Sequence, residues 1–579
     1  MKHLNRRFVL PIVLSLTLLT GACSAAGTAT SATSTSAASS AAASTGGSSS
    51  AAQTLAENAA AVATSAAGYD ESAVVDITLT GTGATTDSAA VTVSGSTVTI
   101  TAAGTYRITG SLDDGQVVVN SAGDGTVRVI LNGVDISSSS TSPLVVTDAQ
   151  DAVVDLADGT QNTLTDATTY VYPDAATDEP NAALFSTADL TITGTGSLTV
   201  TGNSNDGITS KDGLVIESGT ITVTAVDDGI RGKDYVVVNG GTITVTAGGD
   251  GIKSDNEEDA TMGYVSIAGG TIGLTAVGDG IDAVTDVVVT DGTLNVAAGA
   301  KGVKGTVSVV LEGGQITVDA VDDAIHSNGS VSVNGGTLTA SSEDDGIHAD
   351  ADIVISTGTV DIGSSYEGIE GTTVTIDGGD INVVASDDGI NVAGGTDGVT
   401  DTGGGMGGGG EAANSANQLT INGGTLVVDS GGDGLDSNGS ATITGGTITV
   451  NGTTGDGNGA LDTNGTFTIS GGVLIASGSA GMAVAPDASS AQGWLAATVS
   501  GQAGAVVQIV AADGTEIGSF TPTKAFASVI YSSADIASGT TYSIVIDGAS
   551  AGTVTAGEAP AGGMGGGMGG GGMGARPGG

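Results

Sequence analysis

Short runs of alternating apolar and polar residues recur through the middle of the chain, and Gly-Gly and Asp-Gly pairs separate them. Residues 242–246 (Thr-Ile-Thr-Val-Thr) are one such run. Its period of two predicts a β-strand with one buried face, and the glycine-containing pairs between the runs are typical of turns. About three short strands and three turns fit into each repeated unit of 22 residues.

The repeat can be measured at two independent positions. The apolar residue after Asp-Gly recurs from Ile208 to Leu435, and the glycine before the Thr-Ile run recurs from Gly219 to Gly446, mostly in steps of 22 residues. Irregular steps of 29 and 45 residues fall at the same places in both series. A unit this small cannot bury its own apolar face, so it must stack on its neighbours about 4.8 Å away. We therefore expect an all-β fold, a right-handed parallel β-helix of about 22 residues per coil.

Changes in composition divide the rest of the chain. Residues 505–510 and 542–546 are apolar runs near an Asp-Gly pair, and they predict hairpin strands in a small module that also contains the single Trp494. The expected parts are a lipoprotein signal peptide (1–22), a flexible Ser/Ala/Thr-rich tether (23–68), N-terminal β-helix coils with a cap (69–200), the core β-helix (201–490) with a Gly/Met-rich insert (394–413), a C-terminal β-sandwich-like module (491–558) and a disordered Gly/Met tail (559–579).

Composition limits the alternatives. The 579 residues include 99 Gly but only 1 Trp, 9 Tyr and 5 Phe, which are too few large rings for several compact cores. Disorder fits poorly as well, because Val, Ile and Leu run through the whole middle of the chain. The net charge of −50 repels phosphate backbones, so nucleic acid is excluded as a partner. An anionic surface instead suits divalent cations, which take oxygen ligands.

The first residues indicate export. A basic start is followed by an apolar run that is too short to span a bilayer and ends at Cys23, the only cysteine. Small residues before this cysteine resemble the bacterial lipoprotein box, although Thr20 replaces the usual aliphatic residue. The alternative for Cys23 is a free or buried thiol. We expect an extracellular monomer, anchored to the membrane at the bacterial cell surface by a lipid on Cys23.

In a β-helix a repeated residue becomes a column along the axis. The acids of the Asp-Gly turns form one such column, here called the turn column: Asp206, Asp228, Asp250, Asp279, Asp323, Asp345, Glu367, Asp388 and Asp433. A second acid precedes several of them: Asp227, Asp322, Asp344 and Asp387.

Carboxylates stacked in this way need compensation. Two of them about 4.8 Å apart repel by roughly 3.5 kcal/mol at an effective dielectric constant of 20. Calcium ions, backbone N–H groups or raised pKa values can compensate. A single Asp before Gly is ordinary turn chemistry, whereas the doubled acids in adjacent coils, from Asp322 to Asp388, favour calcium as a cofactor. The acidic loop 255–259 is either a further calcium site or a solvated run of charge.

A second column, here called the outer column, lies three residues after the turn column. It contains Arg231, Lys253 and Lys304, and then His326, His348, Glu370, Asn391 and Asp436. The cations either neutralise the turn acids or bind sugar carboxylates in a groove, and both roles are compatible. The two histidines are either a transition-metal chelate or a stacked surface pair. No catalytic triad, zinc motif or phosphate-binding loop is present in the sequence.

Four phrases carry a resemblance to a known family: residues 228–235 (Asp-Gly-Ile-Arg-Gly-Lys-Asp-Tyr), 249–259, 364–371 (Ser-Ser-Tyr-Glu-Gly-Ile-Glu-Gly) and 385–391. They resemble bacterial cell-surface carbohydrate-binding β-helix proteins, over roughly residues 70–558. The resemblance implies binding of polygalacturonate and cellulose, a fold similar to family 9 pectate lyases, and calcium bound by turn acids.

The same resemblance allows a test for lyase activity. Family 9 lyases hold calcium with an Asp-Asp-Gly-x-Asp turn and an acid from the preceding coil. Asp227, Asp228 and Asp206 match this pattern, but Arg231 replaces the final Asp. Asp279 and Asp282 keep only the last spacing. A lyase also needs a lysine base, for which Lys233 or Lys253 is available.

We therefore expect a binding protein rather than an enzyme, with Arg231, Lys233, Lys253, Lys304, Tyr235 and Tyr366 contacting an acidic or plant cell-wall polysaccharide. The alternatives are a calcium-dependent lyase of uronate polymers and an adhesin or structural spacer that uses the Thr-x-Thr strands.

Overall fold

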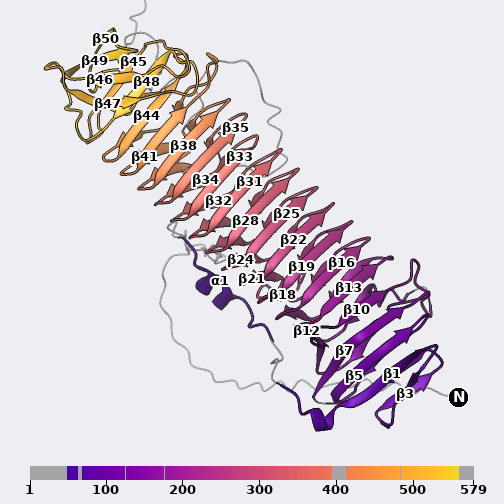
Figure 1. The fold of residues 1–579 in the computed structure, drawn as a ribbon. Helices are drawn as coiled ribbons and strands as arrows, with labels where there is room; N and C mark the ends of the chain where they lie inside the picture. Colours follow the sequence, from indigo (N-terminus) through magenta and orange to yellow (C-terminus); the bar gives the residue numbers. More distant parts are fainter. Residues whose placement is uncertain are drawn as a thin grey trace, which may run out of the picture. The chain divides into compact units, whose positions relative to one another are not determined.

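The computed structural model describes residues 48–62, 68–123, 125–174, 176–393, 413–482 and 484–559. The predicted signal peptide, the lipidated Cys23, nearly all of the Gly/Met-rich insert and the Gly/Met tail after residue 559 lie outside the described residues. The described residues belong to one compact unit. Its strands form a parallel β-solenoid of about 16 turns (Figure 1). The prediction of an all-β parallel β-helix is therefore confirmed. No helix among the described residues has the length and apolar character to cross a membrane.

Each coil contributes a strand to up to three parallel ladders. The first ladder consists largely of short strands that follow the Asp-Gly turns. Its strands are β6 (Gln116–Asn120), β8 (Leu144–Asp148), β11 (Ala182–Ser186), β14 (Asp206–Ser210), β17 (Ile230–Gly232), β20 (Ile252–Ser254), β23 (Ile281–Ala283), β26 (Val303–Gly305), β29 (Ile325–Ser327), β32 (Ile347–Ile355), β34 (Ile369–Ile376), β36 (Ile390–Val392), β39 (Leu435–Ser437) and β42 (Leu461–Thr463).

The second ladder follows in each coil, and β32 and β34 extend into it. Its other strands are β1 (Val75–Gly81), β5 (Gly104–Leu112), β7 (Thr126–Ser137), β9 (Asp151–Leu156), β12 (Asp189–Gly194), β15 (Gly213–Ile216), β18 (Tyr235–Val238), β21 (Tyr264–Ile267), β24 (Asp286–Val289), β27 (Ser308–Leu311), β30 (Ser330–Val333), β37 (Gln418–Ile421), β40 (Ser440–Ile443) and β43 (Phe467–Ile469).

The third ladder contains the alternating Thr-Ile runs. Buried and exposed residues alternate along most of its strands, as the period of two predicted. Its strands are β10 (Gln161–Thr165), β13 (Ser197–Gly202), β16 (Thr220–Ala225), β19 (Thr242–Ala247), β22 (Thr271–Ala276), β25 (Thr293–Ala298), β28 (Gln315–Ala320), β31 (Thr337–Ser342), β33 (Thr359–Ser364), β35 (Asp380–Ala385), β38 (Thr425–Ser430), β41 (Thr447–Asn451) and β44 (Val473–Gly478).

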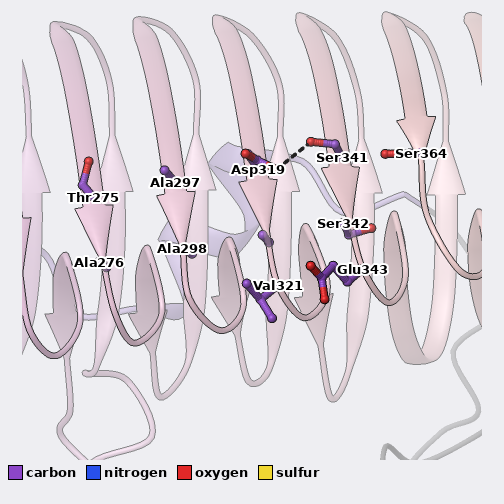
Figure 2. Close-up of a pocket in the computed structure, with 11 residues that line it drawn as sticks. Thr275, Ala276, Ala297, Ala298, Asp319, Val321, Ser341, Ser342, Glu343 and Ser364 are labelled. Atoms are coloured by element: carbon purple, nitrogen blue, oxygen red, sulfur yellow. Dashed lines mark hydrogen bonds between the residues drawn. The ribbon is translucent and has the colours of Figure 1, made fainter.

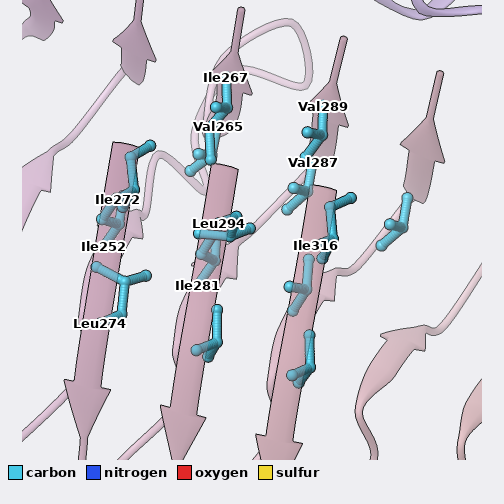
Figure 3. Close-up of a cluster of buried hydrophobic side chains, with 14 of the residues drawn as sticks. Ile252, Val265, Ile267, Ile272, Leu274, Ile281, Val287, Val289, Leu294 and Ile316 are labelled. Atoms are coloured by element: carbon cyan, nitrogen blue, oxygen red, sulfur yellow. The ribbon is translucent and has the colours of Figure 1, made fainter. Parts of the chain in front are cut away.

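The apolar side chains of the three ladders meet in one continuous core. Figure 3 shows three neighbouring coils, in which Ile252 and Ile281 stack one coil apart and Leu274 and Leu294 belong to the third ladder. Each coil leaves part of this apolar surface open above and below, so burial depends on its neighbours. The ends are covered by the N-terminal strands β2 (Ala84–Thr85), β3 (Val91–Ser94) and β4 (Thr97–Ile100), with antiparallel pairings, and by the C-terminal module.

In most coils a glycine directly follows the residue of the turn column and faces a residue of the third ladder. A Cβ added to Gly302, which follows Lys301, would lie 2.2 Å from Cγ1 of Val318, and a Cβ added to Gly229, Gly280 or Gly434 would lie equally close to a valine. In two coils the glycine position holds alanine, at Ala324 and Ala460. The equivalent positions of the third ladder then hold Ala340 and Ala476 instead of a larger residue. The chain thus exchanges volume between two facing positions, which keeps the interior closely packed.

The end of the predicted tether differs from the expectation of flexibility. Residues 48–62, here called the N-terminal strap, lie on the solenoid and contain helix α1 (Ala51–Glu57), whose capping box joins Ser50 and Gln53. The backbone N–H of Ala51 donates to Glu312, the Asn58 amide donates to Asp286, and Ala51 packs on Val288 and Val310. The small Ser and Ala residues that indicate a tether also let this segment pack closely. A 3₁₀ turn (Glu71–Ala73) precedes the first coil.

The C-terminal module adds a second sheet. Strands β45 (Trp494–Ala497) and β48 (Ser528–Ser532) continue the third ladder, with β48 antiparallel to both β44 and β45. Strands β47 (Glu516–Phe520), β46 (Val507–Val510), β49 (Thr541–Ile546) and β50 (Ala549–Thr555) form a separate antiparallel sheet in this order. The two sheets share an apolar cluster that includes Leu495, Val507, Tyr531 and Ile544. Trp494 belongs to the solenoid core.

Candidate functional site

The turn column is held together by backbone hydrogen bonds. One carboxylate oxygen of an acid accepts the backbone N–H of the equivalent residue one coil later. The donor–acceptor distance is 2.9 Å from Asp250 to Asp228 and 3.0 Å from Asp345 to Asp323. The same bond is accepted by Asp206, Asp250, Asp279, Asp388 and Asp433. Backbone N–H groups, one of the three expected compensations, therefore act along most of the column.

Protein cations compensate the first half of the turn column. Strand pairing places Arg231, Lys253, Asp282 and Lys304 in consecutive positions of the outer column. The ammonium group of Lys253 lies 2.5 Å from Asp250, 3.8 Å from Asp228 and 3.7 Å from Asp282.

The neighbouring cations repeat this arrangement. Lys304 lies 2.9 Å from Asp282 and 3.7 Å from Asp279, and Arg231 lies 3.6 Å from Asp206. The predicted salt bridges between these cations and the turn acids are thus present. The arginine that replaces the last acid of the lyase pattern contributes positive charge of its own to Asp206.

Lys301 occupies the turn column itself, between Asp279 and Asp323. Its ammonium group lies 2.7 Å from the fully buried carboxylate of Asp323 and 3.2 Å from Asp322. Burial raises the pKa of Asp323, but the hydrogen bond from His326 and the charge of Lys301 outweigh it and lower that pKa to about 2. The doubled acids Asp322 and Asp323, a predicted calcium site with Asp344, are therefore already paired with a lysine.

His326 and His348 stack one coil apart, with ring centroids 5.1 Å apart. The stacking was expected, but the rings are only 1% and 2% exposed and do not lie on the surface. Each ring bonds through Nδ1 to the turn acid three residues before it, Asp323 or Asp345.

From Asp388 onward, the acids of the turn column have no lysine or arginine partner among the described residues. Within the described ranges, Asp388, Asp433, Asp436 and Asp462 form no ion pair with a lysine, arginine or histidine. Burial, strengthened by the neighbouring carboxylates, raises the pKa of Asp388 to about 6, of Asp433 to about 7 and of Asp436 to about 8. The same causes raise the pKa of Glu367 to about 9. We call Asp388, Asn391, Asp433, Asp436 and Asp462 the uncompensated cluster.

Asn391 adds an unusual feature to this cluster. It lies between Glu370 and Asp436 in the outer column and is 8% exposed. Its amide nitrogen donates to Glu367 in the preceding coil at 2.8 Å. Its amide oxygen is buried and has no hydrogen-bond partner. The following coil places Asp436 next to Asn391 in the outer column. An amide oxygen without a protein partner is free to accept a hydrogen bond or to ligate a cation.

Asp462 had no clear signal in the sequence. Its coil reads Asn458-Gly459-Ala460-Leu461, so the Asp-Gly mark of the repeat is absent. The register of β42 against β39 places Asp462 opposite Asp436. A repeated Leu-Asp pair 26 residues apart was the only sequence trace of this position.

The two aromatic residues predicted to contact ligand differ. Tyr366 is 48% exposed and stands in the turn beside Glu367. Its hydroxyl hydrogen bond with Asp387 and the charge of that carboxylate raise its pKa to about 12. Tyr235 is buried, bonds to Asp189 and accepts the backbone N–H of Val62 in the strap. Tyr235 is therefore not accessible to a ligand while the strap is docked, contrary to expectation.

A hollow lies beside the cationic part of the outer column. Its lining residues are Lys233, Lys253, Asp255, Glu257, Glu258, Asp282 and Val284. The acidic loop supplies one side: Asp255 bonds to Arg231, and Glu258 lies 3.5 Å from Lys233. Burial lowers the pKa of Lys253, but its hydrogen bond to Asp250 and three nearby carboxylates raise it above the ordinary value overall. A lysine held protonated in this way is unsuited to act as a lyase base.

A second hollow lies on the face of the third ladder, over β22 to β33 (Figure 2). Small and hydroxylated residues line it, among them Thr275, Ala297 and Ser341, and Val321 is exposed at its edge. The Ser341 hydroxyl donates to Asp319 at 2.9 Å, as the dashed line in Figure 2 marks. None of its lining residues is a lysine, arginine or histidine.

Parts of this chain are similar to bacterial carbohydrate-binding and polysaccharide lyase-like proteins. A solved structure described as the polysaccharide lyase-like protein from C. thermocellum, in a gadolinium derivative, is similar to this chain with 32% sequence identity and a TM-score of 0.38, over 45% of this chain and 96% of that one. A carbohydrate-binding domain-containing protein from Acetivibrio thermocellus is 40% identical over 128 residues, which is 22% of this chain. The aligned part spans 45% of that relative's length. Residues 94–346 match the family model described as carbohydrate-binding domain-containing protein, which confirms, for this stretch, the resemblance seen in the turn phrases.

Proposed function

We propose that this chain binds an acidic polysaccharide at the cell surface, through calcium held by the uncompensated cluster and through the exposed ring of Tyr366. The match to a carbohydrate-binding domain family supports a sugar polymer as the ligand. The observation that carries the proposal is the group of half-buried carboxylates without protein cations, which lies beside the one aromatic ring among the exposed large apolar residues of the described chain. Attachment to the membrane through Cys23 belongs to the same proposal.

The cluster has the chemistry that calcium requires. Calcium takes six to eight oxygen ligands, including carboxylates, amide oxygens and water. Asp388, Asp433, Asp436 and Asp462 offer carboxylates, and Asn391 offers an amide oxygen that has no other partner. Bound calcium supplies positive charge that a sugar carboxylate can share. The first half of the turn column fits calcium less well, because Arg231, Lys253, Lys301 and Lys304 already lie against its acids.

Tyr366 provides a second contact for a sugar ring. Its exposed aromatic face gives apolar area and a rigid surface at little entropic cost. Its hydrogen bond to Asp387 fixes the ring next to Asp388 and Glu367. A uronate residue can therefore stack on this ring while its carboxylate approaches the cluster. In the hollow, Lys233 lies 3.5 Å from the exposed Glu258 and can exchange that partner for a further carboxylate of an extended polymer.

Affinity electrophoresis tests the proposal. Native gels containing polygalacturonate should retard the protein when calcium is present and should not retard it with chelator. Tyr366→Ala should weaken binding by about two- to tenfold, the range of one aromatic contact. Tyr69→Ala, which changes a tyrosine ahead of the first coil, should bind like the natural protein. Equal retardation with and without calcium would contradict the proposal, and unsaturated uronate product detected by ultraviolet absorbance would show a lyase instead.

A neutral polymer is the second candidate ligand. The hollow in Figure 2 has hydroxyl and carboxylate groups and apolar edges but no cation, which suits hydrogen bonding to uncharged sugars. Gels containing hydroxyethyl cellulose distinguish this ligand, because its binding should not depend on calcium. Retardation by neither polymer would favour a structural spacer.

The pH dependence of stability provides a separate prediction. The folded-state pKa values of Asp388, Asp433 and Asp436 lie near 6, 7 and 8, above the ordinary value of 3.8. The folded state therefore holds more protons than the unfolded state between about pH 4 and pH 8, so stability falls as pH rises through this range. In chelator, the melting temperature should be higher at pH 5 than at pH 8.

Calcium should reduce that difference by stabilising the folded protein at pH 8. The variant Asp436→Asn should show a smaller decline between pH 5 and pH 8 in chelator, because one of the titrating carboxylates is gone. A melting temperature that rises with pH in chelator, or that does not respond to calcium at pH 8, would contradict the account.

A further inference from the structure

Three donor atoms of mixed chemistry converge in the middle of the solenoid. Nδ1 of His348 lies 2.9 Å from Oδ2 of Asp345 and 3.2 Å from Oε2 of Glu370. All three atoms lie within 4.8 Å of one another. Asp345 and His348 are 4% and 2% exposed, whereas the side chain of Glu370 is 16% exposed. The trio is thus preformed and most open to solvent at Glu370.

The other ring nitrogen of His348 also meets a carboxylate. Nε2 lies 3.3 Å from Oδ1 of Asp350. Metal-binding histidines commonly donate their second ring N–H to a carboxylate, which fixes the tautomer and orients the ring. When Nε2 donates to Asp350, the lone pair of Nδ1 is directed at Asp345 and Glu370. Three electron pairs then face one point, and a cation placed there relieves their repulsion.

In the preceding coil, a lysine of the chain itself provides the positive charge. His326 and Asp323 repeat the pairing of His348 and Asp345, with Nδ1 2.8 Å from the carboxylate. There the ammonium group of Lys301 lies 2.7 Å from Asp323. At His348, a third carboxylate stands close by, that of Glu370, and the ion pairs of Asp345 and Glu370 within the described residues involve only this histidine.

We propose that Asp345, His348 and Glu370 bind a transition-metal ion of the Zn²⁺ type, with Asp350 orienting the histidine. One imidazole nitrogen and two carboxylate oxygens suit zinc, which is commonly held by three protein ligands and water. A nitrogen donor disfavours calcium, which prefers oxygen ligands alone. The site shares no residue with the uncompensated cluster. Failure of the proposed polysaccharide binding would therefore not count against zinc binding.

Equilibrium dialysis with ZnCl₂ followed by metal analysis tests the site. The full chain is used in a Cys23→Ser background, so that its thiol does not bind zinc. We expect one equivalent of zinc bound to the chelator-treated protein, retained against excess calcium. His348→Gln and Glu370→Gln should each weaken binding by about tenfold or more. The matched control His326→Gln alters the neighbouring ring, whose acid is already paired with Lys301, and should bind zinc like the natural protein.

Circular dichroism and thermal melting establish that each variant is folded. Glu370 is the partly exposed ligand, so its variant tests the proposal even if His348→Gln does not fold. If the natural sequence binds no zinc, a proton on His348 is enough to offset the repulsion among Asp345, His348 and Glu370. That result would overturn the proposal. Binding that survives Glu370→Gln unchanged, or that excess calcium abolishes, would overturn it as well.

Discussion

Replacing Lys301 with methionine is expected to lower the free energy of unfolding by about 3 kcal/mol. Removing one partner of a buried ion pair costs about 3–5 kcal/mol because the other charge stays buried. Asp323 is completely buried, and Lys301 lies 2.7 Å from it. The lower end of the range applies because Asp323 keeps its bonds to His326 and to the backbone N–H of Asp345. Urea unfolding at pH 7 measures the loss.

The pH dependence of this loss follows from the lowered pKa of Asp323. A carboxyl group with a folded-state pKa near 2 stabilises the protein above its ordinary pKa, and this contribution disappears as pH falls toward 2. The difference between the natural protein and Lys301→Met should therefore be largest above about pH 4 and should shrink below it.

Lys211→Met is the matched control. It removes the same charge from a surface pair, since Lys211 and Glu179 are 37% and 40% exposed. Exposed pairs contribute about 0–1 kcal/mol, so this variant should lose less than about 1 kcal/mol. Equal losses for both lysines would mean that Lys301 is not the cation on which the buried column depends.

The second large effect is expected at the glycine that follows the turn column. Gly302→Ala should destabilise the protein by about 1–3 kcal/mol, the cost of overpacking a filled interior. The new methyl group would lie 2.2 Å from Cγ1 of Val318 and 2.5 Å from the backbone oxygen of Ala324. The natural Ala324 tolerates a similar backbone environment, and it faces Ala340 instead of valine. The side chain of Val318 is thus the obstacle.

A double-mutant cycle tests this explanation. Val318→Ala alone leaves a cavity and destabilises the protein. In the double variant Gly302→Ala/Val318→Ala the new methyl group occupies part of that cavity. The double variant should be more stable than the sum of the two single losses predicts, by about 1 kcal/mol or more. Simple additivity would show that the backbone, and not Val318, excludes alanine at position 302.

The coil and its two columns could be predicted because they depend on spacing. A residue that recurs every 22 positions in stacked coils must line up, so the register of Arg231, Lys253 and Lys304 followed from counting. Counting did not show whether a cation, a backbone N–H group or a raised pKa compensates each turn acid, because that depends on which side chains reach from one coil to the next. Lys301 belongs to the turn column but lacks the Asp-Gly mark, so the lysine that pairs with Asp323 was not apparent as part of the column.

The N-terminal strap was missed for a different reason. Nine of its fifteen residues are Ser or Ala, and it continues a longer Ser/Ala/Thr-rich segment of a composition typical of flexible linkers. Its position depends on a few contacts to residues more than 200 positions away, such as Asn58 with Asp286 and Ala51 with Glu312. Local sequence carries no signal for partners that only the stacking of coils brings together. The burial of Tyr235 under this segment was unpredictable for the same reason.

A crystal structure determined with calcium, with anomalous diffraction data, shows directly whether the uncompensated cluster binds the metal. We expect an anomalous peak among the carboxylates of Asp433, Asp436 and Asp462, with the amide oxygen of Asn391 as a ligand. We expect no such peak between Asp228 and Asp279, where Lys253 and Lys304 already provide positive charge. Water without calcium among Asn391, Asp433, Asp436 and Asp462 would contradict this expectation. Calcium bound only between Asp228 and Asp279 would contradict it as well.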